Sequence, residues 1–180
     1  SMDTDGFTTN FTTISATARH VMSLCLKGGG YAVGSFSKST GGAPASQSRT
    51  GRGKPKAVFL VGFHSQPVGT AGSSRLGIGA SDGSHAQAST LTDTDNINPT
   101  SVRAMDKAGA VFLKKNADAA SVDAQALLTS FDSDGYTLKW DPNDAVADVI
   151  LDIVMRDGIP PTVFDLRAGQ ATTTFELRTT

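Results

Sequence analysis

The sequence is poor in the features that mark several large protein classes. It has a single cysteine, Cys25, among 180 residues, so no intrachain disulfide framework is possible. No apolar run approaches the roughly 18 residues of a membrane-spanning helix, and we expect neither a membrane segment nor a signal peptide. Charged residues make up 18% of the chain and nearly cancel, to a net charge of −1. We therefore expect no nucleic-acid and no membrane partner.

The composition favours strands over helices. Glutamate, a good helix former, occurs only at Glu176, whereas Asp, Thr, Ser and Gly are abundant. Turn residues recur at intervals of about 8–12 positions, which is typical of a sandwich or barrel. We therefore predict an all-β fold, namely an antiparallel β-sandwich of the jelly-roll type with a duplicated β-hairpin.

One stretch occurs twice. Asp-Thr-Asp-Gly-Phe-Thr at 3–8 returns as Asp-Ser-Asp-Gly-Tyr-Thr at 132–137, and an offset of about 129 aligns roughly 29 positions without a gap. Asp and Gly in this pattern are typical of a turn. An internal repeat of this kind predicts one complete structural unit and part of another.

Each copy is predicted to form a hairpin with one face in a core. After the turn and its strand, the second copy alternates between two sets of residues. Because side chains alternate across a strand, we assign the more apolar set to the core. That set is Ala147, Val149, Leu151, Ile153 and Met155, matched in the first copy by Ala18, His20, Met22, Leu24 and Leu26.

The remaining strands follow from apolar runs between turn signals. The run 56–63 is the most apolar and is predicted to be a central strand. Ser81-Asp82-Gly83 predicts a hairpin turn between strands at 75–80 and 84–91. The segment 92–105 is polar and is predicted to be irregular. Further strands are expected at 31–37, 45–50, 108–115, 122–131, 162–166 and 172–178.

The repeat sets the expected domain boundaries. Residues 30–158 would form one complete β-sandwich unit. Residues 1–29 would be a hairpin equivalent to the end of a preceding unit, and residues 159–180 would be C-terminal strands that begin a following one. An alternative places both hairpins inside one closed sandwich by pseudo-symmetry.

Candidate sites are weak in this sequence. The pairs Asp3/Asp5, Asp93/Asp95 and Asp132/Asp134 offer oxygen ligands for calcium, but their loops lack the later carboxylate of an EF-hand, so turn formation is the favoured role. Gly79–Gly83 fits the Gly-x-Ser-x-Gly pattern of hydrolases, but a strand pattern follows it where that motif needs a helix. The three histidines lack metal-ligand spacing. We expect no catalytic residues, no metal and no cofactor.

The order of several motifs resembles a family of β-sandwich repeats in tailed-phage virion proteins. The matching stretches span most of the chain: Gly34-Ser35-Phe36, Gly53-Lys54-Pro55-Lys56-Ala57, Leu76-Gly77-Ile78-Gly79, and Ser130 to Trp140. The resemblance implies a non-enzymatic structural protein of a tail, a fibre or a decorated capsid surface, outside the cell in the virion.

Two functions follow as expectations. The first is assembly, as a homo-oligomer or with other virion proteins, because unpaired strand edges invite pairing with another chain. Aromatic residues of the two hairpin copies are the predicted assembly residues: Phe7, Phe11, Tyr136 and Trp140. The alternative is a carbohydrate-binding, lectin-like module for host recognition, with segments 64–74 and 92–106 as candidate grooves for a host surface glycan.

Overall fold

The computed structural model describes residues 30–63, 73–94, 101–115, 121–156, 162–165 and 176–179. The chain divides into two compact units, Gly29–Gly158 and a second unit made of Ser1–Gly28 with Ile159–Thr180. Every regular element in the described ranges is a strand. Those ranges hold no helix with the length and hydropathy that a membrane crossing requires.

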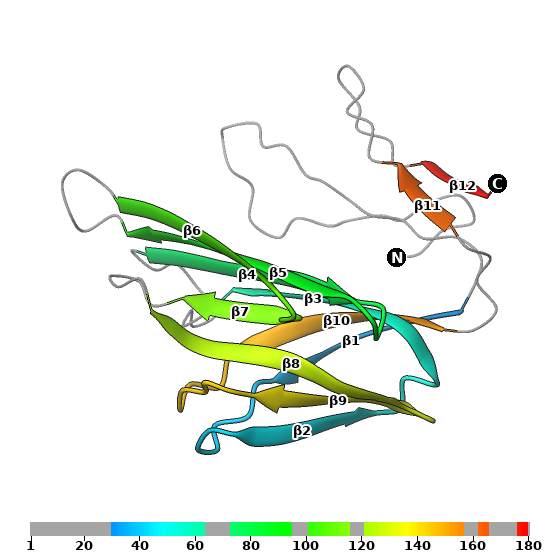
Figure 1. Cartoon of the computed structure of the whole chain (residues 1–180), viewed down its shortest axis with the longest axis horizontal. Helices are drawn as coiled ribbons and strands as arrows, with labels where there is room; N and C mark the ends of the chain where they lie inside the picture. Colours follow the sequence, from blue (N-terminus) through cyan, green and yellow to red (C-terminus); the bar gives the residue numbers. More distant parts are fainter. Residues whose placement is uncertain are drawn as a thin grey trace, which may run out of the picture. The chain divides into compact units, whose positions relative to one another are not determined.

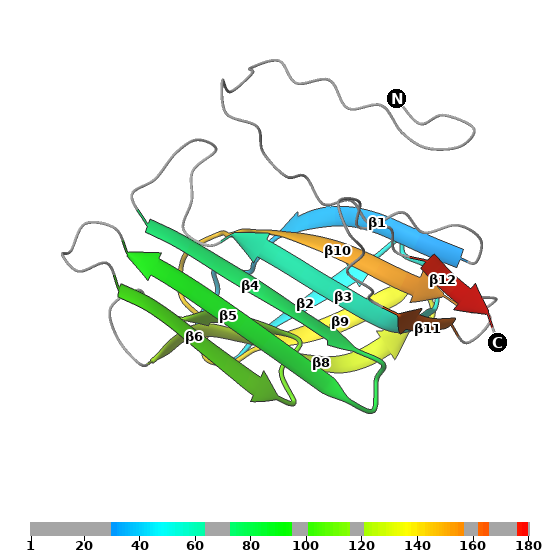
Figure 2. The ribbon, with the colours of Figure 1, turned by 90° about the horizontal axis from the view of Figure 1, so that it is seen from above.

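The unit Gly29–Gly158 is an antiparallel β-sandwich of two sheets, as predicted (Figure 1). One sheet has six strands in the order β1-β10-β3-β4-β5-β6, which lie side by side in Figure 2. The other has four, in the order β2-β9-β8-β7. The strands are β1 (Gly30–Ser37), β2 (Ala45–Thr50), β3 (Pro55–Phe63), β4 (Ser73–Ser81), β5 (Ala86–Thr94), β6 (Ser101–Ala108), β7 (Phe112–Lys115), β8 (Val122–Asp132), β9 (Gly135–Trp140) and β10 (Val149–Arg156).

The strands are nested from the ends of the unit inwards. The first strand pairs with the last, with Gly30 opposite Arg156, and β2 pairs with β9 in the other sheet. This alternation of terminal strands between the sheets is the jelly-roll-like part of the topology. The middle of the unit is simpler, because β3 to β6 follow one another as a meander, and so do β7 to β9.

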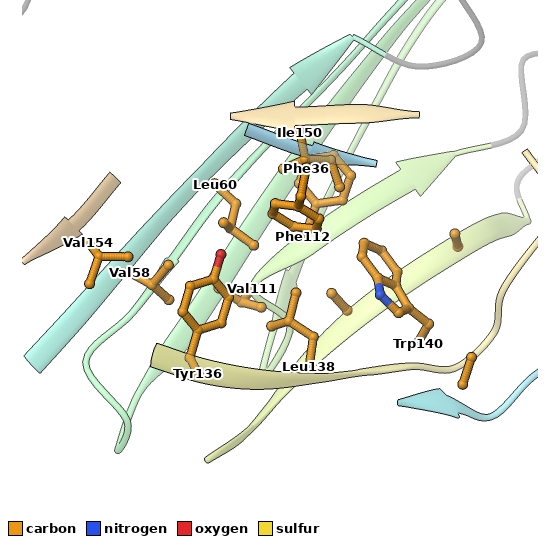
Figure 3. Packing of buried hydrophobic residues seen from close by; sticks show 13 residues of the cluster. Phe36, Val58, Leu60, Val111, Phe112, Tyr136, Leu138, Trp140, Ile150 and Val154 are labelled. Atoms are coloured by element: carbon orange, nitrogen blue, oxygen red, sulfur yellow. The ribbon is translucent and has the colours of Figure 1, made fainter. Parts of the chain in front are cut away.

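The main apolar core of the described residues lies between the sheets (Figure 3), and a smaller cluster is formed by Ala88, Ala110 and Leu113. Leu138 and Trp140 of β9 face Leu60 of β3 and Ile150 of β10, and all four side chains are fully buried. The Trp140 ring meets the Phe112 ring edge to face at 6.1 Å between centroids, a favoured aromatic geometry.

Two glycines permit close backbone approaches. A Cβ on Gly135, which has φ of 155°, would collide with the carbonyl oxygen of Arg49 on β2. This contact explains why the turn of the second repeat copy ends in glycine. A Cβ on Gly79 would collide with the carbonyl oxygen of Val111, so this glycine lets β4 lie close to the start of β7.

Most of the predicted strands are confirmed. The run 56–63 is central, since β3 lies between β10 and β4. Ser81-Asp82-Gly83 does open the turn between β4 and β5. The irregular segment predicted at 92–105 is wrong, because β5 continues to Thr94 and β6 occupies Ser101–Ala108. The strand predicted at 108–115 is limited to Phe112–Lys115.

The second repeat copy is built differently from the prediction. Its hairpin joins β8 to β9 around Asp132–Gly135, whereas β10 lies in the other sheet. The predicted core face of β10 is also wrong. Ile150, Asp152 and Val154 are buried, while Val149 and Leu151 are exposed. The first copy, at 1–29, lies outside the described residues.

In the second unit, β11 (Thr162–Asp165) pairs with β12 (Glu176–Thr179) in an antiparallel two-stranded sheet. Strand β11 falls within the predicted stretch 162–166, whereas β12 overlaps the predicted stretch 172–178 and ends one residue beyond it. Each strand is shorter than expected. Whether they begin a following repeat unit stays a prediction.

Candidate assembly surface

The solvent side of the six-stranded sheet carries an extensive apolar surface. Successive side chains of a strand point to opposite faces of its sheet. In β3, Val58 and Leu60 are buried in the core, so the residues that alternate with them point to the solvent side. Seven of the large exposed hydrophobic residues of the described chain lie on this side: Val33, Phe63, Ile78, Leu91, Val102, Val149 and Leu151.

Strand register makes these residues continuous. One row across the sheet runs Val33, Ile153, Phe59 and Ala80, each opposite the next. The neighbouring row runs Ser35, Leu151, Val61 and Ile78, and a third runs Phe63, Leu76, Leu91 and Ala104. These twelve residues are called the outer face below.

The outer face is uncharged over four strands. Its members on β1, β10, β3 and β4 are aliphatic or aromatic except for Ser35. Charge returns only towards β5 and β6, with Asp93 and Asp106. A shallow hollow of about 210 Å³ lies on that side, between Leu76, Ile78, Leu91 and Met105. Contiguous exposed apolar surface of this kind marks interaction sites in soluble proteins.

The predicted assembly residues lie elsewhere. Tyr136 and Trp140 are fully buried on β9, so they pack the core and are not available to a partner or to a stacked sugar ring. Phe7 and Phe11 lie outside the described residues. Of the two segments proposed for a glycan groove, most of the first is not described, and β5 and β6 occupy much of the second.

Of the aspartates proposed for calcium, Asp132 and Asp134 accept hydrogen bonds at the turn between β8 and β9. Asp134 accepts hydrogen bonds from the backbone nitrogens of Gly51 and Gly53, at 3.0 and 3.1 Å. Asp132 accepts from Ser130 and Thr137. Asp93 lies in β5, while Asp3, Asp5 and Asp95 are not described. Across the described ranges, no three His, Cys, Asp or Glu side chains gather to hold a metal ion.

Asp152 forms a buried ionic group between the sheets. It is fully buried on β10 and accepts hydrogen bonds from Arg52 Nε at 2.9 Å and from the Tyr136 hydroxyl at 3.0 Å. Burial, followed by the charge of Asp152, raises the pKa of Tyr136. The hydrogen bond to Asp152 is the largest cause of the raised pKa of Arg52. The group ties β9 and β10 to the loop after β2.

A second ionic group is formed by two lysines and two aspartates. Lys114 Nζ lies 2.7 Å from Asp144 Oδ2 and 2.7 Å from Asp148 Oδ2, and Lys38 Nζ lies 2.8 Å from Asp144 Oδ1. Burial alone would raise the pKa of Asp144, but hydrogen bonds from Lys114 and Lys38 outweigh it, and the pKa is lowered. Sequence reasoning missed both groups, because the partners are distant in the chain.

The Gly-x-Ser-x-Gly motif has no elbow geometry. Ser81 ends β4, and its hydroxyl donates to the carbonyl oxygen of His85 at 2.7 Å within a hairpin turn. The backbone nitrogen of Gly83 in turn donates to the Ser81 hydroxyl at 3.1 Å. Strand β4 precedes the turn and strand β5 follows it, so no helix comes after this serine and it acts as a turn former.

Comparison with known proteins gives no family: no family model, no curated protein and no solved structure matches the chain.

Proposed function

We propose that this chain is a non-enzymatic structural component of a bacteriophage virion, part of a tail, a fibre or a capsid surface, and that it works by self-assembly. The observation that carries the assembly role is the outer face of the six-stranded sheet, an uncharged surface with exposed Val33, Leu151 and Phe63. The virion location is supported by the resemblance of the repeat motifs alone.

The partner that fits this surface is a second copy of the chain. A surface without charge across β1, β10, β3 and β4 needs no complementary charge, so it is complementary to itself. Two copies related by a twofold axis would cover each other's outer face. Twofold dimers, in which both subunits use the same surface, are the commonest closed oligomers. In β10, the residues that face outwards (Val149, Leu151, Ile153 and Met155) belong to the more apolar alternating set. The same apolar alternation occurs in the first repeat copy at 18–26.

Sedimentation of the purified chain over a wide concentration range tests this proposal. We expect the mass to rise with concentration, and the association to strengthen in sulfate because burial of apolar surface drives it. A probe that binds exposed apolar surface should lose signal as the oligomer forms. A monomer at every concentration, with the probe signal unchanged, would overturn self-assembly.

The virion location has its own test. Purified particles of the source phage, analysed by mass spectrometry, should contain the chain in many copies per particle. Its absence from intact particles, with abundant protein in the host lysate, would exclude a virion component and leave the self-assembly result standing.

A further inference from the structure

The Lys38 ammonium group lies against both an amide and a carboxylate. Its Nζ is 2.7 Å from Asn143 Oδ1 and 2.8 Å from Asp144 Oδ1, and the Lys38 side chain is 0% exposed. We propose that Lys38 and Asn143 react to form an intramolecular isopeptide bond, with Asp144 moving the protons. This proposal is independent of self-assembly.

Asn143 is held as the electrophile. Its Nδ2 donates one hydrogen bond to the carbonyl oxygen of Ser39 at 3.0 Å and another to that of Gly41 at 2.7 Å. These two bonds fix the orientation of the amide plane. The Lys38 nitrogen touches the oxygen of the same amide. Reacting groups held at about 3–3.5 Å gain the large advantage of an intramolecular reaction. Burial of the lysine also limits attack by water, the competing nucleophile.

Asp144 is suited to proton transfer. It is ionised beside two lysines, and a carboxylate is a poor electrophile, so the neutral amide of Asn143 is the group that reacts. Its Oδ1 contacts the Lys38 nitrogen, while its Oδ2 is fixed by Lys114 at 2.7 Å. The carboxylate therefore stays in place while one oxygen accepts and returns protons.

The reaction balances without any further reagent. The Lys38 ammonium gives one proton to Asp144, and the freed lone pair of Nζ forms a bond to Asn143 Cγ while the carbonyl electrons move to Oδ1. A second proton passes from Nζ through Asp144 to Nδ2. The carbonyl then re-forms, the bond from Cγ to Nδ2 breaks and ammonia leaves. The products are a secondary amide, neutral ammonia and a protonated Asp144.

The charges of the cluster remain balanced after this step. Before the reaction, two lysines face two aspartates. Afterwards Lys38 is neutral in the amide and Asp144 carries a proton. The ion pair between Lys114 and Asp148, at 2.7 Å, is left intact. The bond would join residues 105 positions apart, tying the end of β1 to the connection that leads into β10.

Intact-mass measurement of the purified full chain is the direct test. We expect the mass to be lower than that of the sequence by one ammonia, and a digest to contain the Lys38 peptide joined to the Asn143 peptide. A full sequence mass with both peptides recovered separately, unchanged after prolonged incubation of folded protein, would overturn the proposal.

Three variants locate the chemistry. Lys38→Arg keeps the positive charge but removes the nucleophile, and Asp144→Asn removes the proton carrier, so both should show no loss of ammonia. Lys139→Arg is the matched control, because Lys139 pairs with Asp141 on the same connection at 3.1 Å and should leave the cross-link intact. Circular dichroism confirms that each variant is folded. Loss of ammonia that persists in folded Lys38→Arg would assign the bond to another pair and overturn this one.

Discussion

The solvent sides of the two sheets differ in chemistry although both belong to one sandwich. On the six-stranded sheet, rows of valine, leucine, isoleucine and phenylalanine reach solvent. On the four-stranded sheet, the corresponding positions hold Ser46, Ser48 and Thr50 of β2 beside Thr137 and Lys139 of β9. Hydroxyl groups pair there, as between Ser48 and Thr137 at 2.9 Å.

The two sheets differ in how apolar and polar residues alternate along their strands. A sheet that faces core on one side and water on the other alternates between apolar and polar residues, and β2 and β9 follow this rule. Apart from Asp152 and the charged residues Lys56 and Arg156 near the strand ends, β3 and β10 are apolar on both sides, as strands are when both of their faces are covered. Strands β2 and β9 of the four-stranded sheet therefore have the composition of a sheet with one face in water, while β3 and β10 of the six-stranded sheet have the composition of a buried layer.

The largest expected effect comes from the two sides of β10. Ile150→Ala should lower the free energy of unfolding by about 2–5 kcal/mol, because it opens a cavity in a core where Ile150 is fully buried. Its neighbour Leu151 is 41% exposed, and Leu151→Ala should cost well under about 1 kcal/mol in the isolated subunit. Urea unfolding at low protein concentration measures both. Equal losses would contradict the assigned sides.

A lysine introduced on the solvent side of the six-stranded sheet should weaken self-association far more than a lysine introduced on the solvent side of the four-stranded sheet. Leu151→Lys should raise the dissociation constant of self-association by at least about 30-fold, because a buried leucine contributes about 2 kcal/mol. Ser48→Lys on the four-stranded sheet should leave the constant within about twofold. Sedimentation at several concentrations reads both. Equal weakening by the two variants would place the interface elsewhere.

Adjacent hydroxyl groups on β9 extend the comparison to polar contacts. Tyr136→Phe removes a donor from the buried Asp152 and should cost about 1–2 kcal/mol. Thr137→Val removes a hydroxyl on the solvent side and should cost under about 0.5 kcal/mol. Thermal and urea unfolding of the two variants should rank them in this order, and the reverse order would show that Asp152 is satisfied without Tyr136.

The smallest effect concerns acid. Asp82, in the turn of the six-stranded sheet, has its pKa lowered from 3.8 to about 2 by hydrogen bonds from the backbone nitrogens of His85 and Ser84. Because the folded pKa is the lower one, this stabilisation is fully present above pH 3.8 and is lost as the pH falls through about 2. Asp82→Asn should flatten the fall in stability over that window, whereas Asp141→Asn, in the connection after β9, is the control variant. The urea midpoint of each variant, measured at several pH values between 3.8 and about 2, tests this prediction.

The sequence predicts the strands well and their orientation poorly. Strand β3 is found because a continuous apolar run between turns has few other solutions. For β10, both alternating sets contain large aliphatic residues, but Asp152, together with Asp148 just before the strand, makes the buried set resemble a solvent side. Those charges are tolerated inside because Lys114 and Arg52, far along the chain, pair with them. Local periodicity carries no information about such distant partners.

The other misses have related causes. Strand β6 was predicted as irregular because it lies at the edge of its sheet and most of its residues are exposed, so its sequence lacks an apolar pattern. The β10 residues of the outer face, Leu151 and Ile153, belong to the more apolar set of the repeat, but periodicity alone does not say which of two alternating sets faces the core. Tyr136 and Trp140 were assigned to assembly although aromatic residues at such positions also pack cores.

The pairing of the first strand with the last has a consequence for gene architecture. Gly30 lies opposite Arg156, so the chain enters and leaves the sandwich at neighbouring points, about 5 Å apart. A module with adjoining ends can be inserted into a surface loop of another domain without spreading that loop. It can also be copied in series with only a short connector between copies. Recombination can therefore move or multiply this sandwich as a cassette while its interior stays unchanged.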